Sequence, residues 1–370
     1  LLRQQVPGDQ PNWPVAPGNI NLEHWASSCP VDHFAQGDFF DLLGNVWQWS
    51  SSPIDGYDGF SIHSLYDDFS TPTFDGKHNL IKGGSWISTG NLALQHSRYA
   101  FRRHFFQHAG FRYVVSSHRE TDGVNPYETD IRVAQSLDAH YGPDHFGVSN
   151  FAQALVARVA GLVPLGGKAL DMGCSVGRTS LELARYCCEV DGVDFSARFI
   201  DVALTLARQD RFRYALPSEG DLLEYCEARL SPLGIGAEQL ARVHFSQGDA
   251  CNLKPKYQGY DLILAANLIE QLRDPKRFLL DVAHRLNAGG ILVLSSTYHW
   301  QESQTPKEHW LGGIRENGEA LASYPVLQRL LAPAFDELAE PQDLPLVIRQ
   351  TARHYQHALA QVTVWRKRAG

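Results

Sequence analysis

The chain has 370 residues, enough for two domains that each bury a core, and its 44% hydrophobic and 20% charged residues are typical of soluble globular proteins. Its apolar runs are too short to cross a bilayer, and its net charge of -8 argues against a nucleic-acid partner, because no excess positive charge would attract phosphates. The six cysteines are scattered without C-x-x-C pairs, a pattern that fits a reducing, cytoplasmic setting.

Residues 1–116 are rich in Trp, Phe, Gly, Asn, Asp and His, and short apolar runs alternate there with turn signals. This pattern predicts an irregular, loop-rich domain with little helix, which closes on a strand at residues 111–115. Polar residues follow, so we place a linker at 117–126 and a second domain at 127–370. The chain opens on Leu1 rather than methionine, and we therefore expect a fragment of a longer protein.

Beyond the linker, short apolar or β-branched runs alternate with helical patterns, which predicts an α/β domain with a parallel sheet covered by helices on both faces. Strands are expected near 168–172, 189–194, 243–247, 261–266 and 291–296, with a last strand at 360–364. Helices are expected near 150–162, 177–187, 196–208 and 275–287. Residues 211–239 read as an insertion before the third strand.

The strongest local signal is an apolar strand that ends in a glycine-bearing turn and opens a helix. Its candidate ligand-binding residues are Asp171, Gly173, Cys174 and Gly177. Glycine lets a backbone approach a ligand closely, because no Cβ intrudes. The spacing is G-x-x-x-G rather than G-x-G-x-x-G, which favours an adenosyl group over a pyrophosphate.

Three further strand ends carry polar residues that suit an adenosyl ligand. Asp194, followed by Phe195, ends the second strand about 20 residues after the turn, where an acid can bind ribose hydroxyls. Asp249 and Ala250 end the third strand and could bind adenine through the carboxylate and the backbone N–H, and Asn267 ends the fourth. All four ends lie on the carboxyl edge, where open α/β sheets bind ligands. Single elements of this kind also occur in dehydrogenases and in proteins that bind nothing.

Taken together, these strand ends resemble class I (Rossmann-like) methyltransferases, which implies S-adenosyl-L-methionine as the cofactor. Residues 44–49, 82–86 and 109–112 resemble the second half of a formylglycine-generating-enzyme-like domain, a lectin-like fold. Residues 97–106 and 297–313 resemble the 5-histidylcysteine sulfoxide synthase family of ovothiol biosynthesis, whose last domain is a methyltransferase. The resemblance implies 5-thiohistidine as the small-molecule substrate and ovothiol A, methylated on the imidazole nitrogen nearer the side chain, as the product.

That family binds Fe(II) through an upstream helical domain with an H-x-x-x-H-x-E motif, and this chain begins after that region. The resemblance therefore implies that the iron ligands lie outside this chain and that the upstream iron-binding domain of the same parent protein is its partner. His104 and His108 stand four apart, but Gly110 replaces the glutamate, so we expect packing histidines and no metal site. The resemblance also places three residues in the thiol-substrate pocket of the parent: Tyr66, Arg102 and Arg103.

Methyl transfer to an imidazole needs the unprotonated ring nitrogen to be held near the methyl group, so a strong base is optional. Aromatic faces suit a cationic donor, which makes Tyr127, Tyr141 and Phe195 candidate neighbours, although each could be plain core.

For the acceptor, Tyr298, Trp300 and Trp310 could form a lid, and Arg349 could pair with a carboxylate or sit in a structural ion pair. Glu270 or Asn267 could receive the ammonium or the ring N–H. The candidate catalytic residues are Glu270, His299 and Tyr298, with His140 and His354 as lower-ranked bases. Two alternatives stay open: another small imidazole or thiol metabolite as acceptor, and a first domain that serves only for docking.

Overall fold

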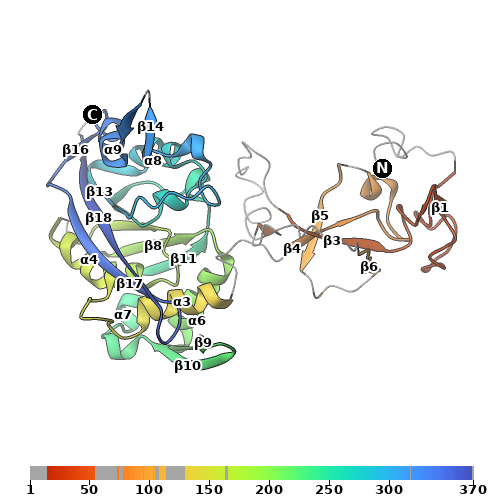
Figure 1. Ribbon diagram of the computed structural model, residues 1–370, viewed down its shortest axis with the longest axis horizontal. Coiled ribbons are helices and arrows are strands. Elements are labelled where there is room, and N and C mark those ends of the chain that lie inside the picture. The colour runs from red at the N-terminus through yellow and green to blue at the C-terminus, as the bar shows by residue number, and fades with distance from the viewer. Residues whose placement is uncertain are drawn as a thin grey trace. The chain divides into compact units, whose positions relative to one another are not determined.

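The computed structural model describes residues 15–54, 73–74, 78–94, 96–102, 104, 108–113, 130–162, 166–316 and 318–368. These residues form two compact units, one of described residues up to 113 and one of those from 130 onward (Figure 1). Each unit is described here by itself. Within the described residues, no helix is both long and apolar enough to span a membrane.

The first unit is irregular and strand-based, as the composition predicts. Its elements are β1 (Ala35–Gln36), β2 (Phe39–Phe40), β3 (Trp47–Pro53), β4 (His78–Lys82), η1 (Gly90–Ala93), β5 (Tyr99–Arg102) and β6 (Ala109–Phe111). Four strands pair in the order β5-β4-β3-β6, and β6 runs parallel to β3. Of the strand expected at 111–115, the structure shows Phe111 as the last residue of β6 and Arg112 and Tyr113 outside any strand, while residues 114 and 115 lie outside the described residues.

The second unit is built on an eight-stranded sheet in the order β11-β8-β7-β12-β13-β18-β16, with β17 also paired to β18. The strands are β7 (Lys168–Met172), β8 (Glu189–Asp194), β11 (Val243–Gln247), β12 (Tyr260–Ala266), β13 (Leu286–Ser296), β16 (Phe335–Glu337), β17 (Gln342–Arg349) and β18 (Tyr355–Lys367). The first five are mutually parallel, and β18 runs antiparallel to β13. The expected α/β fold is therefore confirmed.

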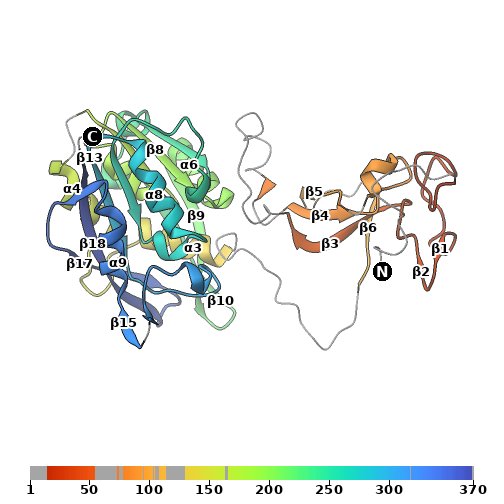
Figure 2. The ribbon, with the colours of Figure 1, turned by 90° about the horizontal axis from the view of Figure 1, so that it is seen from above.

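Helices cover both faces of this sheet. They are α3 (Asp130–Tyr141), α4 (Phe151–Val159), α5 (Arg178–Leu183), α6 (Ala197–Gln209), α7 (Ala237–Leu240), α8 (Pro275–Arg285) and α9 (Ser323–Leu331). Side-chain caps start several of them: Ser196 accepts from the Phe199 N–H, and Asp274 accepts from the Arg277 N–H. Figure 2 shows α8 along one face, where it packs in a core with α9, whereas α4 and α5 contribute to the core of the other face. Helix α5 ends at Leu183, four residues short of the predicted end.

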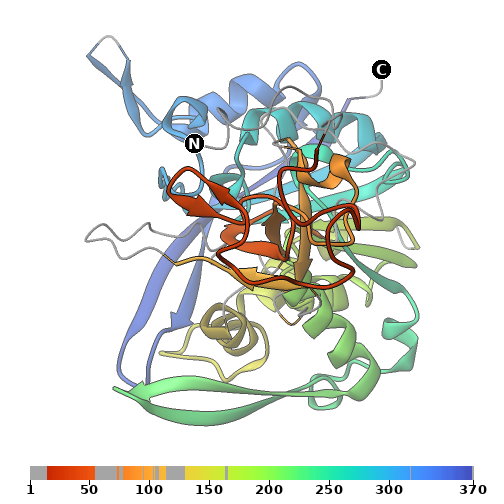
Figure 3. The same ribbon diagram turned by 90° about the vertical axis from the view of Figure 1, so that its right-hand side faces the viewer.

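The predicted insertion is a hairpin followed by short helices. Strands β9 (Arg211–Glu219) and β10 (Leu222–Arg229) pair antiparallel, and η4 (Ser231–Leu233) follows them. The hairpin contacts α3, which also contacts β17, and Figure 3 shows the green hairpin at one end of the second unit. Shorter elements after the parallel strands are η5 (Ala250–Asn252), η6 (Ile269–Gln271), η7 (Lys307–His309), β14 (Ile314–Glu316) and β15 (Glu319–Leu321), and η3 (Ala160–Leu162) extends α4.

Candidate cofactor and acceptor site

The glycine loop after β7 owes its composition to the protein's own packing. Gly173 and Gly177 have φ values of 74° and 92°, a left-handed backbone that favours glycine. A Cβ on Gly173 would come within 2.9 Å of the Leu268 side chain, and a Cβ on Gly177 within 2.6 Å of the Phe245 ring. The atoms that exclude a Cβ belong to Leu268, just after β12, and to Phe245, within β11, so packing favours glycine here in addition to the close ligand approach that the sequence predicts. The Gly173 N–H donates to the Val193 carbonyl at 2.8 Å, which fixes the loop over β8.

Asp171 carries an unsatisfied acceptor at the carboxyl end of β7. Its side chain is buried, with a relative exposure of 1%, and its Oδ2 accepts from the Ser180 hydroxyl at 2.6 Å. Its Oδ1 is also buried and has no hydrogen-bond partner. Burial raises the pKa of Asp171 to about 7, with the charge of Asp194 adding to the shift and the Ser180 hydrogen bond opposing it. A buried oxygen without a donor is costly, so this atom fits a ligand that brings an N–H or a positive charge.

Asp194 occupies the end of the adjacent strand and anchors two turns. Its Oδ2 accepts from the Ser175 N–H and its Oδ1 from the Ser196 N–H, both at 2.8 Å. Burial raises the pKa of Asp194 to about 6, and these two N–H groups hold it from rising further. Each carboxylate oxygen keeps a second lone pair, so the group can still accept from a pair of hydroxyls. Phe195, beside it, is 40% exposed.

The next two strand ends follow the predicted pattern in position. Asp249 caps η5 by accepting from the Cys251 N–H at 2.8 Å, and Ala250 is buried with the core. Asn267 has a φ of 48°, and its N–H donates to the Ser295 carbonyl at 2.9 Å. Because β7, β8, β11 and β12 are parallel neighbours, their polar ends share one edge of the sheet, and Figure 1 labels β8 and β11 among them.

Two buried residues of the predicted cofactor set support the loop from behind. Tyr141 donates its hydroxyl to the Val176 carbonyl at 2.8 Å, and the Arg178 guanidinium lies 5.8 Å from its ring centroid. The Tyr141 ring, predicted to lie near the cationic sulfonium, therefore already has the Arg178 guanidinium over one face. Cys174 is 1% exposed, and burial raises the pKa of its thiol well above the ordinary value. Tyr127 lies outside the described residues.

Glu270 ties the end of β12 to the end of β13. It is 1% exposed, and its Oε2 accepts from the Ser296 hydroxyl at 2.8 Å. Its Oε1 accepts from both the N–H and the hydroxyl of Thr297, at 2.9 and 3.0 Å. With these donors in place, Glu270 orients the strand ends and is poorly placed to serve as a base.

Tyr298 follows β13 in a left-handed conformation, with a φ of 52°. Its hydroxyl donates to the Gln361 side-chain oxygen on β18 at 3.0 Å, and its N–H donates to the Ser296 hydroxyl at 2.9 Å. Burial, and next the charge of Glu270, raise the pKa of the Tyr298 phenol. His299 is exposed, with its ring nitrogen 2.8 Å from the side-chain nitrogen of Gln301. Sequence reasoning missed Gln361, whose only signal was a polar residue within the predicted last strand.

Trp300 and Trp310 belong to the core of the segment after β13. Their rings stack with centroids 6.3 Å apart, and both pack in the α8–α9 core. The Trp300 indole N–H donates to the Ser323 hydroxyl and that of Trp310 to the Thr305 carbonyl, each at 2.8 Å. The structure thus gives both rings a packing role and leaves Tyr298 nearer the strand ends.

Arg349 takes the alternative role weighed for it, a structural ion pair. It is 8% exposed, and its guanidinium binds the Glu224 carboxylate of the β9–β10 hairpin. This bond raises the pKa of Arg349 and lowers that of Glu224. Its cross-strand partner Tyr355 stands six residues from Gln361 along β18, roughly 20 Å at about 3.3 Å per residue.

The remaining candidate histidines of the described residues differ in their surroundings. Burial, and next Arg178, lower the pKa of His140 to about 4, and its Nδ1 is buried without a partner. His354 is exposed, and His108 accepts from the Trp86 indole at 3.2 Å. Across the residues that the structure describes, no cluster of three or more His, Cys, Asp or Glu could hold a metal ion. Tyr66 and Arg103 lie outside the described residues.

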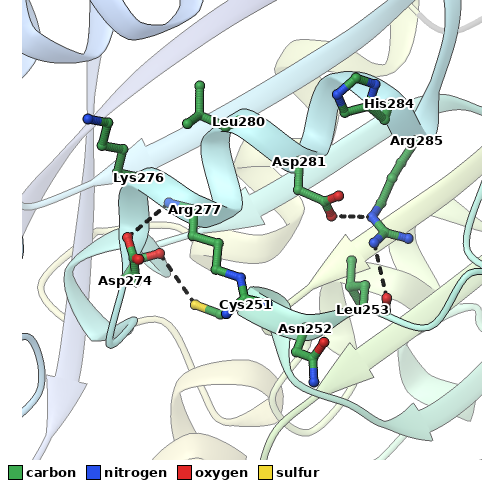
Figure 4. Close-up of a pocket in the computed structure, with 10 residues that line it drawn as sticks. All are labelled: Cys251, Asn252, Leu253, Asp274, Lys276, Arg277, Leu280, Asp281, His284 and Arg285. Atoms are coloured by element: carbon green, nitrogen blue, oxygen red, sulfur yellow. Dashed lines mark hydrogen bonds and ion pairs between the residues drawn. The ribbon is translucent and has the colours of Figure 1, made fainter. Parts of the chain in front are cut away.

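A surface groove of about 500 Å³ lies between η5 and α8 (Figure 4). Arg285 forms part of its wall, and its guanidinium already forms hydrogen bonds within the protein. It donates to Asp281 at 2.5 Å and to the Leu253 carbonyl at 3.1 Å. Asp274 on the other wall caps α8 and accepts from the Cys251 thiol through its carbonyl. The strand-end acids Asp171, Asp194 and Asp249 do not line this groove.

The sheet order, in which β18 runs antiparallel to β13 after five parallel strands, and the polar strand ends define a Rossmann-like methyltransferase unit. A family model described as a methyltransferase domain matches residues 145–332, just over half of the chain, and the chain belongs to that family. A second model, described as a sulfatase-modifying factor enzyme 1-like domain, matches residues 10–117. The predicted combination of the two domain types is thereby confirmed.

Similar curated proteins match short stretches. "Ergothioneine biosynthesis protein 1" of Neurospora crassa is 41% identical over 51 residues, which is 14% of this chain and 6% of that protein. "Hercynine oxygenase" of Mycobacterium tuberculosis is 40% identical over 45 residues, 12% of this chain and 10% of that protein. "Ajmaline N-methyltransferase" of Rauvolfia serpentina is 24% identical over 131 residues, 35% of this chain and 36% of that protein. The chain thus spans a minor part of each of these relatives.

Solved structures with a related fold include the N-methyltransferase NodS from Bradyrhizobium japonicum in complex with S-adenosyl-l-homocysteine. It has a TM-score of 0.37 and 16% identity, and the match covers 64% of this chain and 98% of that one. Magnesium protoporphyrin IX methyltransferase from Synechocystis has a TM-score of 0.36 and 16% identity, covering 66% of this chain and 89% of that one.

Proposed function

We propose that the second unit transfers a methyl group from S-adenosylmethionine to a ring nitrogen of a small imidazole compound, with 5-thiohistidine as acceptor and ovothiol A as product. The observation that carries the proposal is the buried carboxyl pair of Asp171 and Asp194 at neighbouring strand ends, with one Asp171 oxygen lacking a donor. The two groups stand at the edge where an open α/β sheet binds its ligand.

The strand-end residues fit an adenosyl sulfonium. Asp194 keeps lone pairs for the ribose hydroxyls, the Asp249 carboxylate is an acceptor for the adenine amino group, and the Ala250 N–H can donate to a ring nitrogen. The free oxygen of Asp171 and the charge of Asp194 favour a cationic ligand. When bound, the cofactor supplies an electrophilic methyl group on a positively charged sulfur.

The residues around the ends of β12 and β13 orient the acceptor. An imidazole nitrogen near its ordinary pKa of about 6.5 attacks through its lone pair, so positioning near the methyl group supplies most of the rate. Tyr298 stays a protonated phenol because its pKa is raised, and Glu270 is held by three donors from Ser296 and Thr297, so we assign neither the role of proton acceptor. The chain's part is to hold the ring, exclude water and keep one nitrogen unprotonated.

The parent protein, in this proposal, is a bifunctional cytoplasmic enzyme. Relatives named for ergothioneine biosynthesis and hercynine oxygenation share sequence with this chain, and a sulfatase-modifying factor enzyme 1-like domain precedes the methyltransferase unit. We infer that an upstream domain binds Fe(II) and completes a sulfoxide synthase that supplies the thiol-bearing imidazole. The first unit would then be part of that synthase or its docking module.

The test combines calorimetry with product analysis. The chain should bind S-adenosylmethionine with heat release and convert 5-thiohistidine to a product heavier by one methyl group. Histidine and ergothioneine, offered in competition, separate the proposed acceptor from another imidazole or thiol metabolite. The proposal is wrong if no adenosyl ligand binds at millimolar concentration, or if the donor binds and no imidazole is methylated.

A further inference from the structure

The hydrogen bonds behind Tyr298 run in one direction. The Ser296 hydroxyl donates a hydrogen bond to the Glu270 carboxylate at 2.8 Å. The same hydroxyl accepts a hydrogen bond from the Tyr298 N–H at 2.9 Å. These two hydrogen bonds hold Tyr298 at a φ of 52°, a conformation that costs a non-glycine residue about 1 kcal/mol or more. A strained aromatic residue held by a buried carboxylate marks a position that the fold fixes.

At the other end of the side chain, the Tyr298 hydroxyl donates to the Gln361 oxygen at 3.0 Å. Gln361 pairs with Ser296 across β18 and β13, so the phenol lies at the carboxyl edge of the sheet beside the predicted acceptor space. A phenol has one proton and two lone pairs. Since its proton goes to Gln361, the Tyr298 oxygen can only accept a hydrogen bond from a ligand.

An accepting phenol has a definite consequence for an imidazole. A neutral ring carries one N–H, and the nitrogen without the proton is the nucleophile. If the ring gives its N–H to Tyr298, the other nitrogen presents its lone pair. That pair forms the N–CH₃ bond as the C–S pair returns to sulfur, so the positive charge passes from sulfur to the ring, and the ring N–H is later lost to water.

We propose that Gln361 is a specificity-determining residue that determines which imidazole nitrogen is methylated. Because its side-chain oxygen accepts the hydrogen bond of the Tyr298 hydroxyl, the phenol oxygen can only accept a hydrogen bond from the ring N–H. The proposal rests on the proposed imidazole methylation and deepens it. Gln361 acts through Tyr298 and is therefore a positioning residue. The substrate class it selects is a neutral imidazole with one free N–H.

The experiment measures the ratio of the two ring-N-methyl isomers formed by the 370-residue chain from 5-thiohistidine and S-adenosylmethionine, together with kcat and the acceptor KM. Gln361→Leu removes the acceptor for the phenol proton, so we expect the minor isomer to rise and the acceptor KM to increase by about tenfold, the loss of one hydrogen bond. Gln361→Glu keeps a side-chain oxygen that can accept from the Tyr298 hydroxyl and should retain the wild-type isomer ratio.

The chain offers a matched control in Gln328, whose amide donates to the Tyr324 hydroxyl at 2.8 Å on α9. Gln328→Leu should leave the isomer ratio unchanged, and donor affinity measured by calorimetry shows that each variant is folded. A wild-type isomer ratio and KM in Gln361→Leu would overturn the role of Gln361 while imidazole methylation stands, and the same result in Tyr298→Phe would remove Tyr298 from the acceptor site as well. A wild-type chain that binds the donor and methylates no imidazole overturns the proposed function instead.

Discussion

Binding of S-adenosylmethionine should depend on pH through the carboxyl pair at the ends of β7 and β8. The pKa of Asp171 is raised to about 7, so about one tenth of this group is ionised at pH 6 and about nine tenths at pH 8. Asp194, with a pKa of about 6, ionises over the lower part of the same range. If the cationic donor binds the ionised pair, its Kd should fall by about twentyfold between pH 6 and pH 8, about tenfold from Asp171 and about twofold from Asp194.

Isothermal calorimetry in two buffers of different ionisation enthalpy measures this linkage. Near pH 6, donor binding should release about 1.4 protons, about 0.9 from Asp171 and about 0.5 from Asp194, and the release should vanish above pH 8. S-adenosylhomocysteine, which lacks the sulfonium charge, is the matched ligand and should show a weaker pH dependence. Equal Kd values at pH 6 and 8 with no buffer-dependent heat would refute the assignment of these carboxyls to the donor site.

Asp171→Asn separates the effect of this buried carboxyl on stability from its effect on donor binding. A carboxyl whose pKa is raised by folding lowers stability as pH rises from its ordinary pKa of 3.8 to about 7. The variant should therefore unfold like the wild type below pH 4 and be more stable above pH 7, by at most about 4 kcal/mol for a shift of about three units. Its donor affinity should be low and independent of pH.

Three further changes test the rest of the site. Gly177→Ala places a Cβ 2.6 Å from the Phe245 ring at a φ of 92°, so urea unfolding should show a loss of about 2 kcal/mol or more; an unchanged midpoint would contradict the packing role of this glycine. Glu270→Gln places an amide N–H beside the Ser296 and Thr297 groups that donate to Glu270, so it should raise the acceptor KM with little change in the Kd for S-adenosylmethionine. An unchanged KM would remove Glu270 from the acceptor side. Arg349→Ala and Glu224→Ala should each cost at most about 1 kcal/mol, since Glu224 is half exposed; a rise in acceptor KM in the first variant alone would restore Arg349 as a substrate ligand.

The sheet of the second unit could be predicted from sequence because its parallel strands are buried on both faces and read as continuous apolar runs. The predicted strands 168–172, 189–194 and 243–247 match β7, β8 and β11 residue for residue. The polar residues that close these runs sit at one edge by topology alone, which explains why the positions of Asp171, Asp194 and Asp249 could be predicted.

The acceptor side could not be read in the same way, because its contacts join distant segments. Tyr298 and Gln361 are separated by 63 residues, and Arg349 and Glu224 by 125. Sequence spacing also says nothing about direction: Trp300 and Trp310 lie in the predicted lid segment, yet their indole N–H groups point into the core. The reason for Gly173 was likewise hidden, since the neighbour that excludes a Cβ, Leu268, belongs to another strand end.

The central claim is that the carboxyl edge of the second unit's sheet binds S-adenosylmethionine, and the most direct measurement is its Kd for the chain and for Asp194→Asn. The wild type should bind one donor per chain, and the variant, which loses charge and one acceptor oxygen, should bind at least about tenfold more weakly while retaining its fold by circular dichroism. Identical affinity in the two proteins, or no saturable binding by the wild type, would contradict the claim.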